Sequence, residues 1–363
     1  MTTWKLVKLN FERCSAHFGE LGIGMESTTE RVHSDTLFSA WMSAYARLYS
    51  QEIDGLLNRF CHESPPPMRI SSTFIYRQID KRTVYYLPRP LKPPINYPQG
   101  DDLAFFKTYK KLNYLPLKVW KRWYQGVGFT SADRDELISR TNGDNGGELD
   151  DEGTFDYKQA FKIEKIPKIA IDRITRATNL YHTAFVQFEW QQENSQINSL
   201  SGLYFLLQLS QENAELATKL QYALELLGDE GLGGERSSGA GRFKVEWQDL
   251  SEDWQQIVEY SEASAHHYLI SLFWENDISQ LEQLITAKSN YEIQERGGWI
   301  IQSNIRRQMV RMFTEGSVFP EKPGGRLVNV TPSELQNQDG SYKTHPIYRS
   351  GISLSLPIKV ENS

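Results

Sequence analysis

A glycine-rich segment constrains the fold of this chain more than any other feature of its sequence. Five glycines fall between Gly231 and Gly241, after an apolar helical pattern and before a strand pattern. Glycine reaches positive φ without steric cost and lets a phosphate or base approach the peptide N–H groups closely. No Gly-Lys-Ser/Thr follows, as a P-loop requires, and a dinucleotide fingerprint would follow a strand instead of a helix. The segment is therefore either a structural turn or a loop that contacts phosphate or bases.

Hydrophobic periodicity on both sides of this segment predicts an α+β protein. Alternating apolar residues predict strands at 7–11, 184–190 and 243–247, and a more fully apolar run at 203–209 predicts a central strand. Apolar stripes predict helices over 37–48 and 216–227, the second closed by Gly228. A hairpin is predicted over 70–76 and 83–87, and a strand and a short helix over 268–273 and 278–287. Two α+β units of similar plan account for this order.

An insertion interrupts the first unit. Five prolines between Pro88 and Pro98 exclude regular structure there, and residues 103–132 contain no acid but many lysines and aromatic residues. Residues 141–153 are polar and glycine-rich, which predicts a flexible loop. We therefore expect an N-terminal domain over 1–165 with an insertion at about 88–155, and a C-terminal domain over 166–363 that carries the loop 231–243.

Composition narrows the classes of function. The net charge of −6 argues against a free-standing nucleic-acid binder, so any RNA footprint must be local. Cys14 and Cys61 are too few for a disulfide framework and are not spaced as a zinc site, and the seven histidines form no metal signature, so we expect no metal and no cofactor. No apolar stretch is long enough to cross a membrane, and no signal core follows Met1, which favours a cytoplasmic location.

The glycine-rich loop, in its setting after a helix and before a Phe-containing strand, resembles that of the RAMP superfamily of CRISPR proteins. Short motifs in the expected order are similar to one branch of it, the subunit of type III-A (Csm) effector complexes that holds the 5′ handle of the CRISPR RNA: HSDTLF at 33–38, LPRP at 87–90, AIDR at 170–173, TNLY at 178–181, HPIYR at 345–349 and LSLPI at 354–358. The resemblance implies two ferredoxin-like (RRM-like) domains with an inserted, thumb-like segment. It also implies a non-catalytic subunit that joins the large polymerase-like subunit to a backbone RAMP subunit and meets target RNA through the guide duplex.

Candidate RNA contacts follow from the resemblance and from residue chemistry. In the glycine-rich loop they are Gly233, Gly234, Arg236, Ser237, Ser238, Gly239, Gly241 and Arg242. A helix start at His33 and Ser34 offers free N–H groups to a phosphate, although helix capping explains Ser34 and Asp35 equally well. Further candidates before the strand at Ala184 are Arg173, Arg176 and Asn179, for which surface ion pairs are the alternative.

The candidate thumb lies within residues 88–123. Lys107, Lys110 and Lys111 are expected to meet phosphate, and Tyr109 to stack on bases. The alternative is structural, with Trp120, Trp123 and Tyr124 filling a small core. Arg306, Arg307 and Arg311 form another basic cluster, which contacts either RNA or the large subunit.

Two other functions fit the sequence. A metal-independent endoribonuclease that processes CRISPR RNA needs a general acid or base, and His17 and His33, which flank the loop 19–24, are the candidates. A protein-only scaffold would also carry the net negative charge, and it predicts assembly without RNA.

Overall fold

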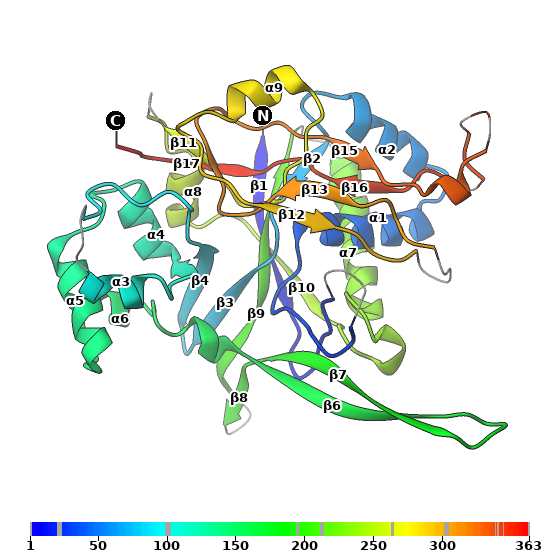
Figure 1. The fold of residues 1–363 in the computed structure, drawn as a ribbon, viewed down its shortest axis with the longest axis horizontal. Coiled ribbons are helices and arrows are strands. Elements are labelled where there is room, and N and C mark those ends of the chain that lie inside the picture. Colours follow the sequence, from blue (N-terminus) through cyan, green and yellow to red (C-terminus); the bar gives the residue numbers. More distant parts are fainter. Residues whose placement is uncertain are drawn as a thin grey trace.

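An antiparallel sheet of eight strands runs through the centre of the molecule (Figure 1). The computed structural model describes residues 2–19, 24–98, 103–193, 196–210, 214–262, 265–300, 305–337, 339, 341–343 and 345–361. Along the sheet the strands are β10 (Lys244–Gln248), β1 (Thr3–Asn10), β9 (Gln196–Leu209), β3 (Phe74–Ile79), β4 (Arg82–Pro88) and β5 (Tyr114–Pro116). Two short strands, β2 (Met68–Ile70) and β8 (Trp190–Glu193), also pair with β9.

Four of these strands and two helices form a ferredoxin-like unit that is split in the sequence. The chain order is β1, α1 (Ser34–Leu48), β3, β9, α7 (Ala214–Glu230) and β10. The spatial order β10-β1-β9-β3 places the fourth strand beside the first and the third between the first and second, as in the β-α-β-β-α-β arrangement. A long excursion of the chain separates β4 from β9.

This arrangement corrects the predicted domain boundary. Residues 1–165 and 166–363 are not separate units, because β9 pairs with β1 over Thr3–Leu9 and β10 pairs with β1 on its other edge. The predicted strands at 203–209 and 243–247 and the helix at 216–227 are present, but they complete the first unit. Sequence order misled the prediction because the insertion lies inside this unit, between its hairpin and its third strand.

Both faces of the central sheet are buried. Val7, Phe205 and Leu207 pack beneath α1, α7 and α2 (Ile53–His62) in one hydrophobic core. Leu6, Tyr204 and Leu206 belong to a second core, which includes Trp254 of α8 (Glu252–Val258). Because neighbouring residues of a strand point to opposite faces, burial on both sides explains why β9 is apolar at nearly every position from Leu203 to Leu209.

The C-terminal part adopts a related arrangement. Its strands are β11 (His266–Leu269), β12 (Ile293–Arg296), β13 (Val310–Phe313), β14 (Val318–Phe319) and β17 (Ser355–Ile358), with helix α9 (Ile278–Leu284) after β11. β11 lies between β14 and β17, and β12 pairs with β13. The second crossover carries β15 (Leu327–Asn329), η3 (Ser333–Leu335) and β16 (Tyr348–Ser350) where a ferredoxin-like unit has a helix.

The insertion is a helical subdomain, which corrects its assignment as a thumb. It contains α3 (Leu103–Tyr109), α4 (Leu117–Tyr124), α5 (Ser131–Asn142) and α6 (Glu148–Asp151). Trp120, Trp123 and Tyr124 are fully buried in it, so the structural alternative holds for these three. The predicted loop at 141–153 is also ordered: Leu149 is buried, and the Glu136 carboxylate accepts the N–H groups of Leu149 and Asp150.

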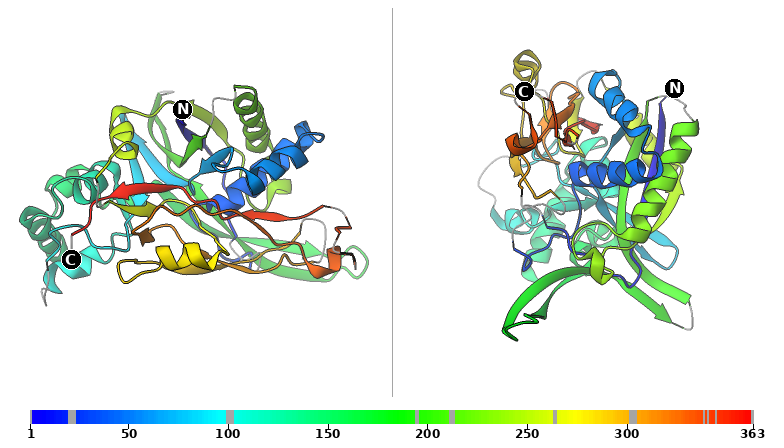
Figure 2. Two further views of the ribbon diagram at one scale, coloured as in Figure 1. Left: turned by 90° about the horizontal axis from the view of Figure 1, so that it is seen from above. Right: turned by 90° about the vertical axis from the view of Figure 1, so that its right-hand side faces the viewer.

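The element that projects from the body is a long hairpin made of β6 (Phe161–Ile171) and β7 (Thr178–Phe188) (Figures 1 and 2). Its strands pair over eleven positions, from Phe161 opposite Phe188 to Ile171 opposite Thr178. Eleven extended residues span about 35 Å. Among the described helices, none is both long and apolar enough to cross a bilayer.

Candidate RNA-binding site

The glycine-rich loop folds back against the segment that follows β1. The N–H groups of Gly234 and Gly241 donate to the carbonyls of His17 and Ser15, both at 2.8 Å. Gly233 and Gly241 have φ near +98° and +79°, and a Cβ on either would lie within 2.4 Å of a carbonyl oxygen. Gly239 also has positive φ, but a Cβ there would meet no described atom within 4 Å. Close backbone packing therefore explains Gly233 and Gly241, whereas Gly239 lies in open space.

The loop and helix α1 together form a pocket of about 240 Å³. The face of α1 opposite its apolar stripe supplies Thr36, Ser39, Ser43 and Arg47, and the loop supplies Gly231–Gly234 and Arg236. Arg31, which precedes α1, and Arg296 and Arg307 from the C-terminal part complete the charged lining. The described lining contains five arginines and no Asp or Glu, which is the chemistry of an anion site.

Three of the five arginines already have carboxylate partners. Arg31 pairs with Glu315, Arg47 with Glu230, and Arg296 with Asp35. Arg236 and Arg307 form no ion pair with any described residue. Burial and the nearby Arg349 lower the pKa of Arg307, partly offset by Asp35. These two guanidinium groups are therefore the ones open to an external anion.

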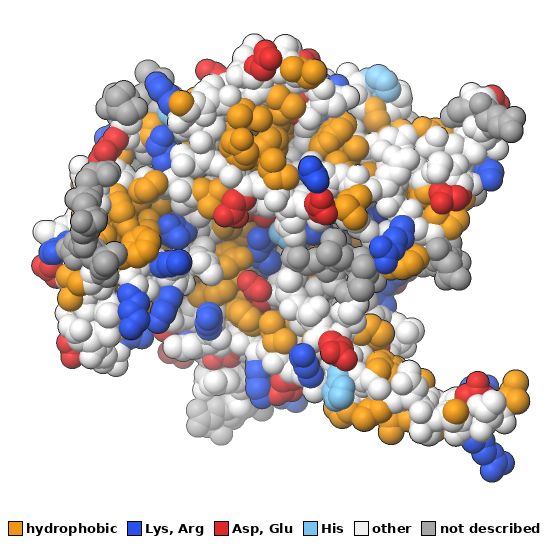
Figure 3. Space-filling model, viewed as in Figure 1, with side chains coloured by type: hydrophobic (Ala, Val, Ile, Leu, Met, Phe, Trp, Pro, Cys, Tyr) orange, Lys and Arg blue, Asp and Glu red, His pale blue; other side chains and the backbone are white. Residues whose placement is uncertain are grey.

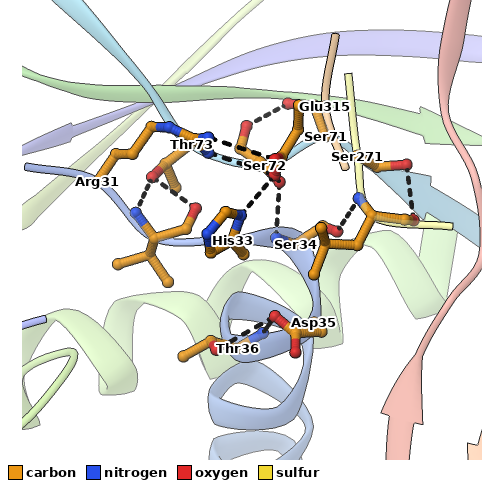
Figure 4. A network of polar contacts seen from close by, with 12 residues as sticks. Arg31, His33, Ser34, Asp35, Thr36, Ser71, Ser72, Thr73, Ser271 and Glu315 are labelled. Carbon is orange, nitrogen blue, oxygen red and sulfur yellow. Dashed lines mark hydrogen bonds and ion pairs between the residues drawn. The ribbon is translucent and has the colours of Figure 1, made fainter. Parts of the chain in front are cut away.

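A buried polar network lies beneath the start of α1 (Figure 4). The Glu315 carboxylate meets His33 Nδ1 at 2.8 Å and Arg31 at 3.3 Å, and it also accepts the Ser72 hydroxyl. Burial alone would raise the pKa of Glu315, but Arg31 and His33 hold it well below its ordinary value. The Ser34 hydroxyl accepts the N–H of Leu272 at 2.9 Å, while the Ser34 N–H donates to Ser72.

This network corrects the expectation for His33 and Ser34. Ser34 is 1% exposed and both of its polar groups bind protein, so it ties α1 to the C-terminal part and is closed to RNA. His33 is largely buried, although its edge reaches the pocket. His33 is the N-cap residue and makes no side-chain cap, and the Ser34 hydroxyl binds Leu272 instead of the first turn. The Asp35 carboxylate does accept a first-turn N–H, that of Thr36, at 2.7 Å.

Asp35 carries a second buried cluster. Its carboxylate receives two hydrogen bonds of 3.0 Å from Arg296 of β12 and one from Arg349 of β16. Burial would raise its pKa, yet the two arginines hold the pKa far below the ordinary range. The N-terminal turn of α1 is thus fixed to two strands that lie about 260 and 314 residues away along the chain.

The remaining loop candidates lie outside this pocket. Arg242, Ser237 and Ser238 are exposed, and Ser238 donates to the Glu235 carboxylate at 3.1 Å. Glu235 also pairs with Lys168 of the hairpin, which connects the loop to β6. Residues 20–23 of the first glycine-rich segment lie outside the described residues.

The candidate RNA contacts that precede Ala184 lie at the tip of the hairpin. Arg173 and Arg176 lie in its turn and Asn179 near the start of β7, all exposed. Ile169 and Leu180 are directly opposite each other and each is 62% exposed, so the distal hairpin also presents an apolar face. In the space-filling view, hydrophobic side chains follow this hairpin (Figure 3). The element that projects from the body is therefore β6–β7 and not the insertion.

On the insertion, Lys107, Lys110 and Lys111 are exposed, whereas Tyr109 is 3% exposed. Tyr109 packs against Trp123 and Phe129, so it belongs to the core of the helical subdomain and is closed to bases. Lys and Arg side chains gather over this side of the molecule (Figure 3).

The histidines proposed for the endoribonuclease alternative are both engaged. His17 is 8% exposed, and its Nδ1 lies 2.7 Å from the carbonyl oxygen of Ala184. His33 pairs with Glu315. Among the described residues, no cluster of His, Cys, Asp or Glu has the arrangement of a metal site.

Sequence reasoning missed Arg31, Arg47 and Arg296. A signal existed for Arg47, because Thr36, Ser39, Ser43 and Arg47 recur at helical spacing opposite the apolar stripe. Nothing in the sequence joins Arg31 to Arg296, since tertiary contacts alone bring them to one pocket.

Comparison with known proteins agrees with this architecture. The model of the RAMP superfamily matches residues 25–244, and the model of the CRISPR Csm4 C-terminal domain matches residues 262–358. The chain therefore belongs to the RAMP superfamily. Within it, the C-terminal match and the relatives below identify a Csm4-type member.

The relatives share this description over most of their length. The chain is 26% identical to "CRISPR system Cms protein Csm4" of Methanocaldococcus jannaschii, covering 94% of each chain. It is 24% identical to the protein of that name from Mycobacterium tuberculosis, covering 98% of this chain and 97% of the relative.

Two solved structures have the same fold. They are crystal structures of a Csm1–Csm4 cassette in complex with cA4 and with AMPPNP, with TM-scores of 0.53 and 0.51. Each match covers 100% of both chains at 17% identity.

Proposed function

We propose that this chain is a non-catalytic, RNA-binding subunit of a type III-A CRISPR effector complex that anchors the 5′ handle of the CRISPR RNA. The observation that carries the proposal is the pocket between α1 and the glycine-rich loop, whose described lining has five arginines and no acid. RNA phosphates are the anion that such a surface suits, because Arg supplies both charge and a fork of N–H donors.

The pocket has the shape of a short track for an RNA backbone. From Thr36 to Arg47 the polar face of α1 extends eleven residues, or about 16 Å. Arg307 and Arg236 add positive charge that no described carboxylate neutralises. The hydroxyls of Thr36, Ser39 and Ser43 add groups able to hydrogen-bond phosphate or ribose.

The hairpin β6–β7 extends the RNA-binding surface. Lys168 joins it to the loop through Glu235, so an RNA held in the pocket would pass close to the distal half of β6. The exposed Ile169 and Leu180 would then press between or against bases, as apolar wedges do in other nucleic-acid complexes. We therefore assign to the hairpin the role of the thumb that lies between the guide RNA and the target RNA.

The proposed protein partners are the large polymerase-like subunit and a backbone RAMP subunit. The relatives are CRISPR system proteins, and the two solved structures contain Csm1 together with Csm4. The negative overall charge leaves surface outside the RNA footprint for such contacts.

A charge-reversal pair tests RNA binding. Arg236→Glu places a negative charge in the pocket, whereas Arg242→Glu makes the same change on the same loop outside it. With CRISPR RNA and the neighbouring subunits, we expect Arg236→Glu to lower guide retention and to reduce the salt dependence of binding by about one phosphate contact. Arg242→Glu should have the smaller effect. Equal RNA binding by wild type and both variants would show that the pocket does not hold the handle.

The absence of catalysis is tested separately. Repeat RNA incubated with the purified chain in EDTA should stay intact. Cleavage that His33→Ala or His17→Ala abolishes would instead support the endoribonuclease alternative.

A further inference from the structure

A second cavity, of about 650 Å³, lies between the helical subdomain and the base of the hairpin β6–β7. Its described lining consists of residues from α3, from α5, from the segments around them and from the start of β6: Glu30, Thr108, Lys111, Leu112, Asn113, Tyr114, Arg140, Thr154, Phe155, Tyr157, Lys158 and Phe161. Roughly 300–1,000 Å³ is the usual range for small-molecule sites. The cavity is separate from the arginine pocket, with which it shares no described lining residue.

Aromatic rings form much of the wall. Tyr114 and Tyr157 are stacked with their centroids 4.1 Å apart and their planes within 9°. The Arg140 guanidinium lies over the ring of Phe155, 4.6 Å from the ring centroid. Aromatic and guanidinium planes are the surfaces on which proteins stack unpaired RNA bases.

Two polar groups in the lining lack a protein partner. The Thr154 hydroxyl oxygen is buried, its residue is 2% exposed, and it has no hydrogen-bond partner among the described residues. The side-chain amide of Asn113 is exposed, and within the described chain nothing bonds to it. A hydroxyl and an amide offer both donors and acceptors, which the edge of a nucleobase requires.

The rim of the cavity is basic. Lys111 and Lys158 are exposed, and neither forms an ion pair with a described residue. Glu30, the acid in the described lining, accepts a hydrogen bond of 3.0 Å from the Tyr157 hydroxyl. The balance at the rim therefore favours an anionic ligand that also has an aromatic part.

We propose that this cavity is a second nucleotide subsite, in which one base of a single-stranded RNA segment enters among Phe155, Tyr157 and Asn113 while Lys111 and Lys158 bind the flanking phosphates. This inference rests on the RNA-binding function proposed above. It extends the RNA path past the hairpin base, because Phe161 is both the first residue of β6 and part of the lining.

The test uses the full chain and a fluorescein-labelled, 20-nucleotide single-stranded RNA. Lys111→Glu combined with Lys158→Glu changes the rim, and Asn113→Ala removes the proposed base contact from an exposed position where folding should be unaffected. The charge-matched control is Lys81→Glu combined with Lys288→Glu, two exposed lysines outside the cavity and outside the candidate RNA contacts. We expect about tenfold weaker binding for the rim variant, and a smaller loss for Asn113→Ala that depends on the base offered.

A second readout maps the contact directly. RNA carrying 4-thiouridine should crosslink under light to peptides that contain Asn113 or Phe155. Equal losses from the rim and control pairs, without such crosslinks, would reduce the cavity to part of a diffuse basic surface and overturn the proposal. Loss of RNA binding in Arg236→Glu with no effect of the cavity variants would leave the proposed function standing and remove the subsite alone.

Discussion

Asp35 is the residue on which the joint between the two parts of the chain depends. It is fully buried and neutralises Arg296 and Arg349, which are 2% and 3% exposed. Removing one partner of a buried ion pair leaves an uncompensated charge, at a cost of about 3–5 kcal/mol. We therefore expect Asp35→Asn to lower the free energy of unfolding by about that amount in urea titrations.

The control for this prediction is an ion pair of similar distance at the surface. Lys5 and Asp249 lie 2.6 Å apart, but the Asp249 side chain is 85% exposed. Asp249→Asn should leave the unfolding midpoint almost unchanged, because solvent screens exposed pairs. A loss as small in Asp35→Asn as in Asp249→Asn would contradict the structural role given to Asp35.

The lowered pKa of His267 should make the stability of the fold depend on pH. Burial, Lys322 and His266 lower its pKa from 6.5 to about 4. The unfolded chain therefore takes up a proton at this side chain below pH 6.5, while the folded chain resists until about pH 4. Stability contributed by neutral His267 is complete above pH 6.5 and is lost as the pH falls toward 4.

The measurement is the free energy of unfolding at several pH values between 7 and 4 for wild type and His267→Gln. The variant lacks this titration, so its stability should fall less steeply over that interval. Parallel curves would show that His267 titrates alike in the folded and unfolded chain.

At the scale of elements, the glycine-rich loop contains glycines that close packing requires and glycines that have room for a side chain. Gly241→Ala would place a Cβ 2.2 Å from the carbonyl oxygen of Leu232, whereas Gly239→Ala meets open space. Both changes carry the cost of positive φ, about 1–2 kcal/mol, and Gly241→Ala adds a clash with backbone. Urea unfolding should therefore show the larger loss for Gly241→Ala, and the reverse order would contradict this description of the loop.

Substitutions on the exposed face of the hairpin β6–β7 should change the affinity for RNA without changing the stability of the fold. Ile169→Ser with Leu180→Ser removes an exposed cross-strand apolar pair, so the unfolding midpoint should stay the same. If these side chains press on bases, affinity for single-stranded RNA should fall about fivefold in fluorescence anisotropy. The control is Ala170→Ser, at the neighbouring position of β6 on the opposite face. An equal loss from the control and from the apolar pair would argue against an apolar wedge.

Local patterns predicted elements well where packing agrees with periodicity. The apolar run of β9 and the stripe of α7 both match the structure, because burial on one or two faces leaves a direct signal in sequence. The predicted helix end at Gly228 was wrong: α7 continues to Glu230, and the glycine with positive φ that follows it is Gly231. The segment around Leu149 is polar and glycine-rich, so its composition predicted a flexible loop. It is ordered because its backbone N–H groups bind the carboxylate of Glu136 on the preceding helix, a contact that composition does not reveal. The hairpin β6–β7 was not predicted as a projecting element, because exposed isoleucines resemble ordinary strand residues.

At the scale of the whole molecule, the candidate site is a product of tertiary structure. The glycine-rich loop and Arg236 were predicted from local sequence, but the pocket also needs Arg31 before α1 and Arg296 from β12. These residues meet because α1 is fixed to the C-terminal part through Asp35 and Glu315. No local pattern encodes that meeting, and for the same reason the sequence placed the domain boundary inside the first unit.

The arginine excess at this joint predicts that RNA stabilises the molecule. Arg296, Arg307 and Arg349 lie close to the carboxylate of Asp35, and burial together with Arg349 lowers the pKa of Arg307. RNA phosphate in the pocket would relieve this repulsion, so bound RNA should raise the melting temperature of the full chain. At 100 times Kd the gain is about 2.7 kcal/mol.

Arg307→Gln separates this effect from general binding. Without RNA the variant should be as stable as wild type or more so, since one of three neighbouring positive charges is gone. With single-stranded RNA its thermal shift should be smaller, and added salt should reduce the wild-type shift toward that of the variant, because salt weakens phosphate contacts. A variant less stable without RNA, with a wild-type shift upon RNA addition, would show that Arg307 serves only the fold. The joint between the two parts of the chain would then be complete without its ligand.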